Sequence, residues 1–248
     1  MDPTGQSEVP KPMREILGKP VLDWQIAFFQ RDPRITGFII CTGYKQETIT
    51  QHFQDPRKYG TNILWIADKS EGLGTEGALK EALRYIPSGE EMVLVKAADV
   101  FSDLDPGVLI DSHKKGQPIT IVGVEGQINV GSLDVEDTTP VGSSTRTFRL
   151  KEMGPKTGPN KRAEMGDSAI SILSLDAAEK LKEGGTYPND FLQRLLVEGT
   201  EINGIVHPPG FWTNLTTEDD LTELTQYLEE GRRNYPPENL ISTSLEHE

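Results

Sequence analysis

The sequence contains little cysteine and no long apolar run. Its single cysteine, Cys41, cannot form an internal disulfide, and its place in the apolar run Phe38-Ile39-Ile40-Cys41 predicts a buried thiol rather than a nucleophile. No stretch reaches the roughly 18 apolar residues needed to span a membrane. The first residues contain neither a basic start nor an apolar segment, so we expect no secretory signal. These absences together predict a cytoplasmic protein in a reducing compartment.

Positive charge is also scarce. Lysine and arginine number 25 against 39 aspartates and glutamates, and the formal net charge is −14. A surface of this sign repels nucleic-acid phosphates and anionic lipids, which argues against a nucleic acid or a membrane as partner. A nucleotide ligand would have to be held by a few local cations, a metal ion or backbone amides against this overall field. The hydrophobic share of 35% is typical of a globular chain.

Short apolar runs alternate with helical patterns through the first half of the chain. The apolar runs predict buried strands at residues 37–41, 62–66, 92–95 and 119–122. Between them, apolar residues at helical spacing predict helices at residues 20–30, 46–53, 75–85 and 106–115. This alternation is typical of βαβ units, and continuously apolar strands are typical of a sheet covered on both faces. We therefore expect a three-layer, Rossmann-like α/β fold with a mixed, mostly parallel sheet and helices on both faces.

The second half of the chain is less regular. Residues 126–168 are rich in Gly, Thr, Ser and Pro, and they predict an insertion on the same sheet with one strand near residues 147–150. Regular patterns return with a strand and two helices, which we expect at residues 169–173, at residues 190–198 and after the segment 216–220. We therefore expect one domain over residues 1–232 and a tail over residues 233–248.

One aspartate stands at the end of an apolar strand. The segment Val95-Lys96-Ala97-Ala98-Asp99 runs from the expected strand directly into Asp99. The carboxyl ends of parallel strands are where open α/β sheets bind ligands. A carboxylate at that place is a natural ligand for a Mg²⁺ ion that bridges triphosphate oxygens. The alternative is that Asp99, like Asp103 and Asp105 after it, is an ordinary turn or cap residue.

A glycine-rich turn precedes the helix expected at residues 75–85. In Ser70-Glu71-Gly72-Leu73-Gly74-Thr75, the two glycines allow backbone amides to approach a ligand closely. The helix that follows presents its positive N-terminal end to an anion. A glycine-rich turn before a helix is common, so by itself this turn is weak evidence for a ligand site. It becomes informative only together with the other segments described below.

Five segments, taken in chain order, form a recognisable set. They are Pro10-Lys11-Pro12-Met13, Thr42-Gly43-Tyr44, Glu71-Gly72-Leu73-Gly74-Thr75 with Gly77-Ala78-Leu79, Asp99, and Phe211-Trp212 with the residues after it. The set resembles the sugar-1-phosphate nucleotidyltransferases, which include glucose-1-phosphate thymidylyltransferases and mannose-1-phosphate guanylyltransferases. The resemblance spans about residues 9–228. No single motif is decisive, but five motifs in the same order are hard to produce by chance.

The resemblance implies an activity and its substrates. An oxygen of a sugar 1-phosphate would attack the α-phosphorus of a nucleoside triphosphate and release pyrophosphate, and positioning and charge neutralisation would supply most of the catalysis. Asp99 would hold Mg²⁺, and Lys11 would contact phosphate. A second lysine is expected on the sugar-phosphate side, where Lys156 is the candidate and Lys151 the fallback. For each lysine the alternative is solvated surface charge.

The resemblance also implies contacts to the base and the sugar. The loop that contacts the nucleobase would be formed by Glu71, Gly72, Leu73, Gly74 and Thr75. Asp167, in Asp167-Ser168-Ala169, would line the sugar site, where the family has Asn-Ala-Gly. Asn214 takes the place of the family's second metal carboxylate, and its amide oxygen would ligate Mg²⁺ without adding charge.

The chain departs from the family near its beginning. Only nine residues precede Pro10, so we expect the family's first strand and its Gly-Gly-x-Gly-Thr-Arg loop to be missing. That strand is normally central in the sheet, and another segment, a partner chain or a rearrangement would have to pair its neighbours. A homo-oligomer or a partner subunit is therefore an open alternative. Ala97-Ala98 also stands where the family usually has a small polar pair.

Two functions of different class follow from these features. In the first, the chain is an enzyme that makes a nucleotide sugar or a related activated metabolite. In the second, it is a catalytically impaired relative that binds a nucleotide sugar and acts as a regulatory or scaffold subunit. The retained Lys11, Asp99 and Gly72 loop favour the first function, whereas the departures favour the second. A glycosyltransferase of related fold is the weakest alternative, because no second aspartate stands two residues from Asp99.

Overall fold

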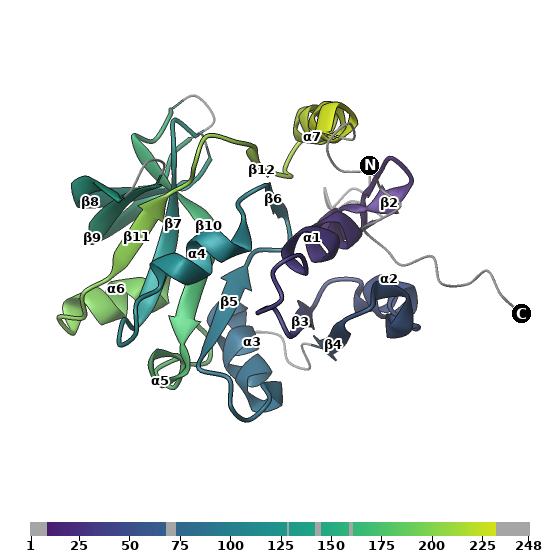
Figure 1. The fold of residues 1–248 in the computed structure, drawn as a ribbon, viewed down its shortest axis with the longest axis horizontal. Helices are drawn as coiled ribbons and strands as arrows, with labels where there is room; N and C mark the ends of the chain where they lie inside the picture. Colours follow the sequence, from purple (N-terminus) through teal and green to yellow (C-terminus); the bar gives the residue numbers. More distant parts are fainter. Residues whose placement is uncertain (1–8, 68–72, 128, 142–144, 159–160, 232–248) are drawn as a thin grey trace, which may run out of the picture. The chain divides into compact units, whose positions relative to one another are not determined.

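The computed structural model describes residues 9–67, 73–127, 129–141, 145–158 and 161–231. Within them the chain forms two compact units (Figure 1). The first unit takes residues from Met1–Lys69, Ala98–Asp103 and Thr213–Glu248, and the second from Ser70–Ala97 and Leu104–Trp212. The expected single domain over residues 1–232 includes both units and stays a prediction.

The first unit combines the N-terminal elements with the last helix. Its helices are α1 (Val21–Phe29), α2 (Gln46–His52) and α7 (Glu218–Gly231), and its 3-10 turns are η1 (Lys11–Met13) and η2 (Pro56–Tyr59). Its strands form three pairs, which are β1 (Glu15–Ile16) with β2 (Lys19–Pro20), β3 (Gly37–Thr42) with β4 (Asn62–Ala67), and β6 (Val100–Ser102) with β12 (Trp212–Asn214). The β3 and β4 strands are parallel, as expected for a βαβ unit. Among the described residues, no helix has the length and apolarity that a bilayer crossing requires.

The core of the first unit joins α1 and α2 to one face of the β3 and β4 pair. Its buried members are Met13, Leu22, Ile26, Ile49, Phe53, Tyr59 and Ile63. Phe38 and Ile40 of β3 pack against this cluster. Cys41 follows on the opposite face, because side chains alternate along a strand, and it is exposed. The expectation of a buried Cys41 is therefore wrong, since an apolar run does not reveal which face of its strand is covered.

The second unit is built on a six-stranded sheet (Figure 1). Across the sheet the strands are β5 (Met92–Lys96), β10 (Met165–Ser174), β7 (Ile119–Glu125), β11 (Asn203–Val206), β9 (Thr145–Lys156) and β8 (Gly131–Val141). Among these described strands, β7 and β11 are the only parallel neighbours, and the others are antiparallel. The fold is therefore mixed α/β, and the mostly parallel sheet expected from the sequence is not found in this unit.

Helices cover both faces of this sheet. On one face, Leu109 of α4 (Pro106–Ser112) packs against Val122 and Ile170. On the other face, Ile121 lies in a larger cluster with residues of α3 (Gly74–Ala82), α5 (Leu175–Ala178) and α6 (Asn189–Val197). Neighbouring residues of β7 thus point into different clusters, which gives this unit the expected three layers.

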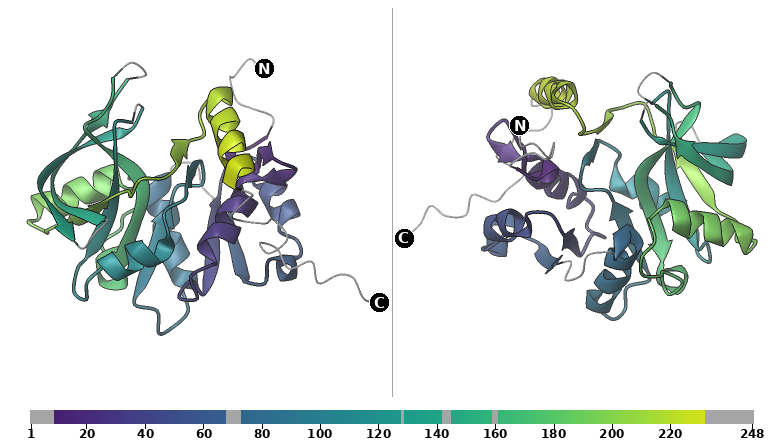
Figure 2. Two further views of the ribbon diagram at one scale, coloured as in Figure 1. Left: turned by 45° about the horizontal axis from the view of Figure 1, so that its top comes forward. Right: turned by 180° about the vertical axis from the view of Figure 1, so that it is seen from behind.

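A long hairpin of β8 and β9 forms one edge of the sheet (Figure 2). The sequence predicted only one strand in this region, near residues 147–150. Strand β8 was missed because Gly131–Val141 contains Gly, Ser, Asp and Thr rather than a continuous apolar run. Its pairing with β9 makes it a strand, and pairing between segments leaves little trace in local composition.

Candidate active site

Asp99 lies in the turn that leads into β6, where it forms an ion pair with Lys11. The Lys11 Nζ and Asp99 Oδ2 atoms are 3.2 Å apart, and the two side chains are 42% and 39% exposed. The turn is held against α1, because Gln25 Nε2 donates a hydrogen bond of 3.0 Å to the Ala98 carbonyl oxygen. An ion pair this exposed contributes only about 0.2–1 kcal/mol to stability. Both charged groups are therefore available to a ligand.

Asn214 ends β12 beside the same turn. The amide of the next residue, Leu215, donates a hydrogen bond of 2.8 Å to the Asp99 carbonyl oxygen. The side-chain oxygen Oδ1 of Asn214 is buried and accepts no hydrogen bond within the described residues. A buried oxygen left unpaired costs about 1–3 kcal/mol. Such an oxygen fits a hard cation as its ligand, which agrees with the metal role that the sequence analysis assigns to Asn214.

The protein donors around this turn are few. Within the described residues no group of three or more His, Cys, Asp or Glu side chains is placed to hold a metal ion. Asp99 and Asn214 would supply one carboxylate and one amide oxygen. Mg²⁺ commonly takes one or two protein oxygens and fills its remaining positions with water and substrate phosphate. The donor set therefore fits a metal that binds together with a phosphorylated substrate better than a closed structural metal site.

The second unit brings Lys156 and Asp167 together. Lys156 ends β9, and Asp167 lies in β10, where its Oδ1 accepts a hydrogen bond of 3.0 Å from the Ala169 amide. Burial raises the pKa of Asp167 to about 6, although that hydrogen bond and the positive charge of Lys156 act in the opposite direction. The carboxyl group of Asp167 is therefore close to a cation and is less acidic than an ordinary aspartate.

The alternative lysine faces a different carboxylate. Lys151, also on β9, contributes to a lowered pKa of Glu136, after the larger effect of the Arg149 hydrogen bond to the same carboxylate. Glu136 lies on the neighbouring strand β8 of the hairpin. Lys156 rather than Lys151 is therefore the lysine whose charge acts on Asp167, and this placement supports Lys156 as the candidate.

The described part of the glycine-rich turn begins at Leu73. Glu71 and Gly72, which the sequence analysis assigns to the base-contacting loop, lie outside the described residues. Gly74 starts α3 with a φ of +64°, and an added Cβ would overlap the Gly185 carbonyl oxygen, so glycine is required there. The Glu76 amide donates to that same carbonyl at 3.1 Å. This first-turn amide is therefore used by the protein itself rather than by an anion.

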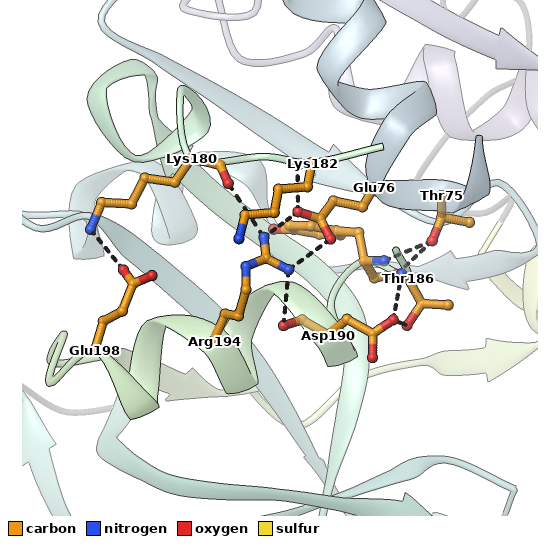
Figure 3. Close-up of polar contacts among 9 residues, drawn as sticks. Thr75, Glu76, Lys180, Lys182, Thr186, Asp190, Arg194 and Glu198 are labelled. Carbon is orange, nitrogen blue, oxygen red and sulfur yellow. Dashed lines mark hydrogen bonds and ion pairs between the residues drawn. The ribbon is translucent and has the colours of Figure 1, made fainter. Parts of the chain in front are cut away.

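Side chains that the sequence analysis did not single out hold the first turn of α3 (Figure 3). Glu76 is fully buried and accepts hydrogen bonds from the Lys182 amide at 2.7 Å and from both terminal guanidinium nitrogens of Arg194 on α6. The sequence signal for this contact is a charged residue among small ones in Gly74-Thr75-Glu76-Gly77-Ala78. That signal does not identify Arg194, which is 118 positions away.

Comparison with known proteins places this geometry in a family. The chain matches the family model described as nucleotidyl transferase over residues 6–231. It is 27% identical over 245 residues to a glucose-1-phosphate cytidylyltransferase of Salmonella typhi. That alignment covers 90% of this chain and 89% of the Salmonella protein. A probable glucose-1-phosphate cytidylyltransferase of Bacillus subtilis is 27% identical over 249 residues, covering 92% and 91%. The crystal structure of HddC from Yersinia pseudotuberculosis complexed with GMP-PN has a TM-score of 0.71 at 21% identity, over 91% of this chain and 93% of that one.

These similarities establish first a class and then a family. The class is that of the nucleotidyltransferases, which are enzymes with a mixed α/β fold, and the HddC structure supports the fold. The match covers well over half of the chain, so the chain belongs to the nucleotidyl transferase family. The resemblance read from the sequence motifs is thereby confirmed. The roles of individual site residues remain predictions.

Proposed function

We propose that this enzyme transfers a nucleoside monophosphate from a nucleoside triphosphate to a sugar 1-phosphate and releases pyrophosphate. The family match over residues 6–231, with relatives named for this type of transfer, carries the proposal. The relatives compared with this chain are named for catalysis, and none of these similarities favours the alternative of a regulatory or scaffold subunit.

The reaction exchanges one phosphorus–oxygen bond for another. An oxygen of the sugar 1-phosphate forms a bond to the α-phosphorus, and the bond from that phosphorus to the oxygen shared with the β-phosphate breaks. The electron pair of the broken bond leaves with pyrophosphate. The attacking oxygen is largely ionised at neutral pH, because the second pKa of a phosphate monoester is about 6. The protein therefore contributes positioning and charge rather than a general base.

Lysine side chains would contact the anionic substrates. Lys11 lies beside Asp99 in an exposed ion pair, so its ammonium group can turn to a phosphate oxygen without uncovering a buried charge. Lys156 would contact the phosphate of the sugar 1-phosphate, and Asp167 near it would accept hydrogen bonds from sugar hydroxyls. Such local cations are needed because the net charge of −14 disfavours the approach of an anion.

Asp99 and Asn214 would hold a divalent cation, which we take to be Mg²⁺. Asp99 would supply a carboxylate oxygen, and Asn214 would supply the buried amide oxygen that accepts no hydrogen bond. When bound, the ion supplies positive charge that neutralises phosphate oxygens. Leu73, Gly74 and Thr75, with Glu71 and Gly72 before them, would frame the nucleobase.

Release of pyrophosphate tests the proposal directly. The protein is incubated with Mg²⁺, with ATP, CTP, GTP, UTP or dTTP, and with a panel of sugar 1-phosphates, and pyrophosphate is measured by a coupled assay. CTP with glucose 1-phosphate is the first pair to try, because two of the relatives are named for that reaction. We expect release with at least one pair, reduced at least about 100-fold by Asp99→Ala.

A matched variant separates the loss of a ligand from the loss of any surface carboxylate. Asp176 is an exposed aspartate of α5 in the second unit, and Asp176→Ala should keep the activity of the unchanged protein. Pyrophosphate release that is equal in the unchanged protein and in Asp99→Ala would contradict the proposed role of Asp99. No release with any pair would contradict the proposed function.

A further inference from the structure

Helix α3 is anchored differently at its two ends. Toward its C-terminal end, Leu79 and the following Leu83 pack against the apolar cluster of the second unit. At its N-terminal end, the anchoring contacts are hydrogen bonds and one ion pair. Apolar packing is non-directional, whereas hydrogen bonds to charged groups fix distances and angles. The turn at residues 73–75 therefore lies at the N-terminal end of α3, which is the end held by hydrogen bonds and an ion pair.

Residues 73–76 each contact the segment formed by residues 182–187. The Gly184 amide donates to the Leu73 carbonyl oxygen at 2.8 Å, and the Gly185 carbonyl blocks any side chain at Gly74. Thr75 Oγ1 accepts a hydrogen bond of 2.7 Å from the Tyr187 amide and donates one of 3.2 Å to the Tyr187 carbonyl. The Thr75 hydroxyl is therefore used by the protein, so Thr75 would meet a nucleobase through its backbone.

The centre of these contacts is the ion pair of Glu76 with Arg194 (Figure 3). Glu76 is 0% exposed, and the Arg194 side chain is 27% exposed. Arg194 also donates to the Lys180 carbonyl oxygen at 3.3 Å and to the Asp190 carbonyl oxygen at 3.4 Å. One guanidinium group thus connects the first turn of α3, helix α6 and the chain that leads into residues 182–187.

The same segment continues toward the Lys156 and Asp167 group. Tyr187 packs its ring against Phe191, with the ring centroids 5.7 Å apart. Its hydroxyl lies 2.5 Å from Oγ of Ser171 on strand β10. Ser171 is two residues after Ala169, whose amide donates a hydrogen bond to Asp167. Burial, with a smaller contribution from the negative charge of Asp167, raises the pKa of Tyr187, so this hydroxyl stays protonated. Residues 182–187 therefore join the turn at residues 73–75 to the surroundings of Asp167.

We propose that Glu76 and Arg194 are a positioning pair that sets the affinity of the enzyme for the nucleoside triphosphate through the turn at residues 73–75. The inference rests on the proposed function and adds to it two residues that touch no substrate. A buried ion pair is weak evidence for stability, because replacing both charges with apolar groups is often neutral. If this ion pair serves to position the turn, apolar replacements of both residues should preserve the stability of the protein but weaken its binding of the triphosphate.

Two variants separate these possibilities. Glu76→Gln keeps the shape of the side chain and removes its charge, and the double variant Glu76→Leu/Arg194→Met replaces the pair with apolar groups. We expect Glu76→Gln to raise the KM for the triphosphate about tenfold, with kcat and the KM for the sugar 1-phosphate within about twofold of the unchanged enzyme. The double variant should recover the thermal midpoint that the single variant loses, yet keep the raised KM.

A double variant with both a normal thermal midpoint and a normal KM for the triphosphate would overturn the proposal, because the pair would then serve stability alone. Equal changes in the KM values of both substrates would overturn it as well. The matched control is Glu198→Ala, which breaks the exposed ion pair of Lys180 with Glu198 in the same region. This control should behave as the unchanged enzyme in KM and kcat.

A binding measurement keeps this test separate from the test of the proposed function. If the unchanged protein transfers no nucleotide, the proposed function fails, and the dissociation constant for Mg²⁺ with CTP is measured by calorimetry instead. A dissociation constant raised about tenfold in both variants and unchanged in Glu198→Ala would support the positioning pair. Equal dissociation constants in all four proteins, or no binding by the unchanged protein, would overturn it.

Discussion

The carboxyl group of Asp167 depends strongly on its surroundings. Burial raises its pKa from the ordinary value of 3.8 to about 6, against the hydrogen bond from the Ala169 amide and the charge of Lys156. Desolvation therefore outweighs two groups that favour the ionised form. At neutral pH the ionised form prevails, which suits an acceptor of hydrogen bonds from a sugar.

This pKa predicts how Asp167→Asn changes stability with pH. Between about pH 4 and pH 6 the folded protein holds a proton on Asp167 that the unfolded chain has lost, so this group lowers the stability as the pH rises through that window. Asn cannot ionise and can still accept the Ala169 hydrogen bond. Relative to the unchanged protein, Asp167→Asn should be more stable at pH 7.5 than at pH 5, as measured by urea unfolding. A difference that is independent of pH would contradict the raised pKa.

Asn214 offers a second prediction at the scale of a single residue. Asn214→Asp adds a negative charge where an amide oxygen now lies buried and unpaired. We expect the Mg²⁺ concentration for half-maximal activity to fall about tenfold, equivalent to about 1.4 kcal/mol. Asn214→Ala should raise that concentration, because it removes the oxygen. A titration of pyrophosphate release with Mg²⁺ measures both, and an unchanged midpoint in both variants would exclude Asn214 as a ligand.

At the scale of elements, strand β10 carries an irregularity that shapes the site. Its register against β7 shifts between Asp167 and Ser171. Within that shift, Ala169 has a φ of +58°, a left-handed conformation that is unfavourable for a residue with a Cβ. The Ala169 carbonyl accepts a hydrogen bond of 3.0 Å from the Ala97 amide, and its own amide donates to Asp167. The local backbone is therefore held by contacts that also orient the Asp167 carboxylate.

This backbone conformation predicts that Ala169→Gly stabilises the protein. Glycine adopts the left-handed region without steric cost, although its unfolded chain has more conformational entropy to lose. The net gain should be about 0.5–1 kcal/mol in the free energy of unfolding, measured with urea at neutral pH. Ala163→Gly, at a buried alanine of the same unit, is a control that should be destabilising. A destabilised Ala169→Gly would contradict the strain argument.

Helices and strands were predicted correctly where a short stretch of sequence carries its own apolar pattern. The helices expected at residues 20–30 and 46–53 correspond to α1 and α2, and the strands expected at residues 92–95 and 119–122 correspond to β5 and β7. The β8 and β9 hairpin was largely missed, because its strands are specified by pairing between segments. The same limit applies to strand direction, since an apolar run reads alike in a parallel and an antiparallel sheet.

At the scale of the whole molecule, charge sets the conditions for binding. The net charge of −14 and a triphosphate have the same sign, so long-range repulsion opposes their encounter. Attraction would come from single lysines such as Lys11 and Lys156 at short distance. Salt screens the long-range repulsion more than a close contact, because the Debye length falls from about 30 Å at 0.01 M to about 10 Å at 0.1 M.

Because salt screens this repulsion, moderate salt should improve the binding of the triphosphate. The KM for the triphosphate at constant free Mg²⁺ should fall as the NaCl concentration rises from about 0.01 M to about 0.1 M. Initial rates of pyrophosphate release measure the effect, and repeating the series with potassium glutamate controls for specific ions. A KM that rises steadily over this range would mean that local cations, rather than the net charge, govern the encounter.

The sequence by itself determined the alternation of apolar strands and helices, the position of Asp99 after a strand, and the family, because each depends on residues close together or on motifs in order. Only the tertiary structure decided that Cys41 is exposed, that most neighbours in the large sheet are antiparallel, and that Glu76 meets Arg194. These features depend on which distant segments pack together. Burial and charge around a side chain arise from that packing, and local spacing does not encode them.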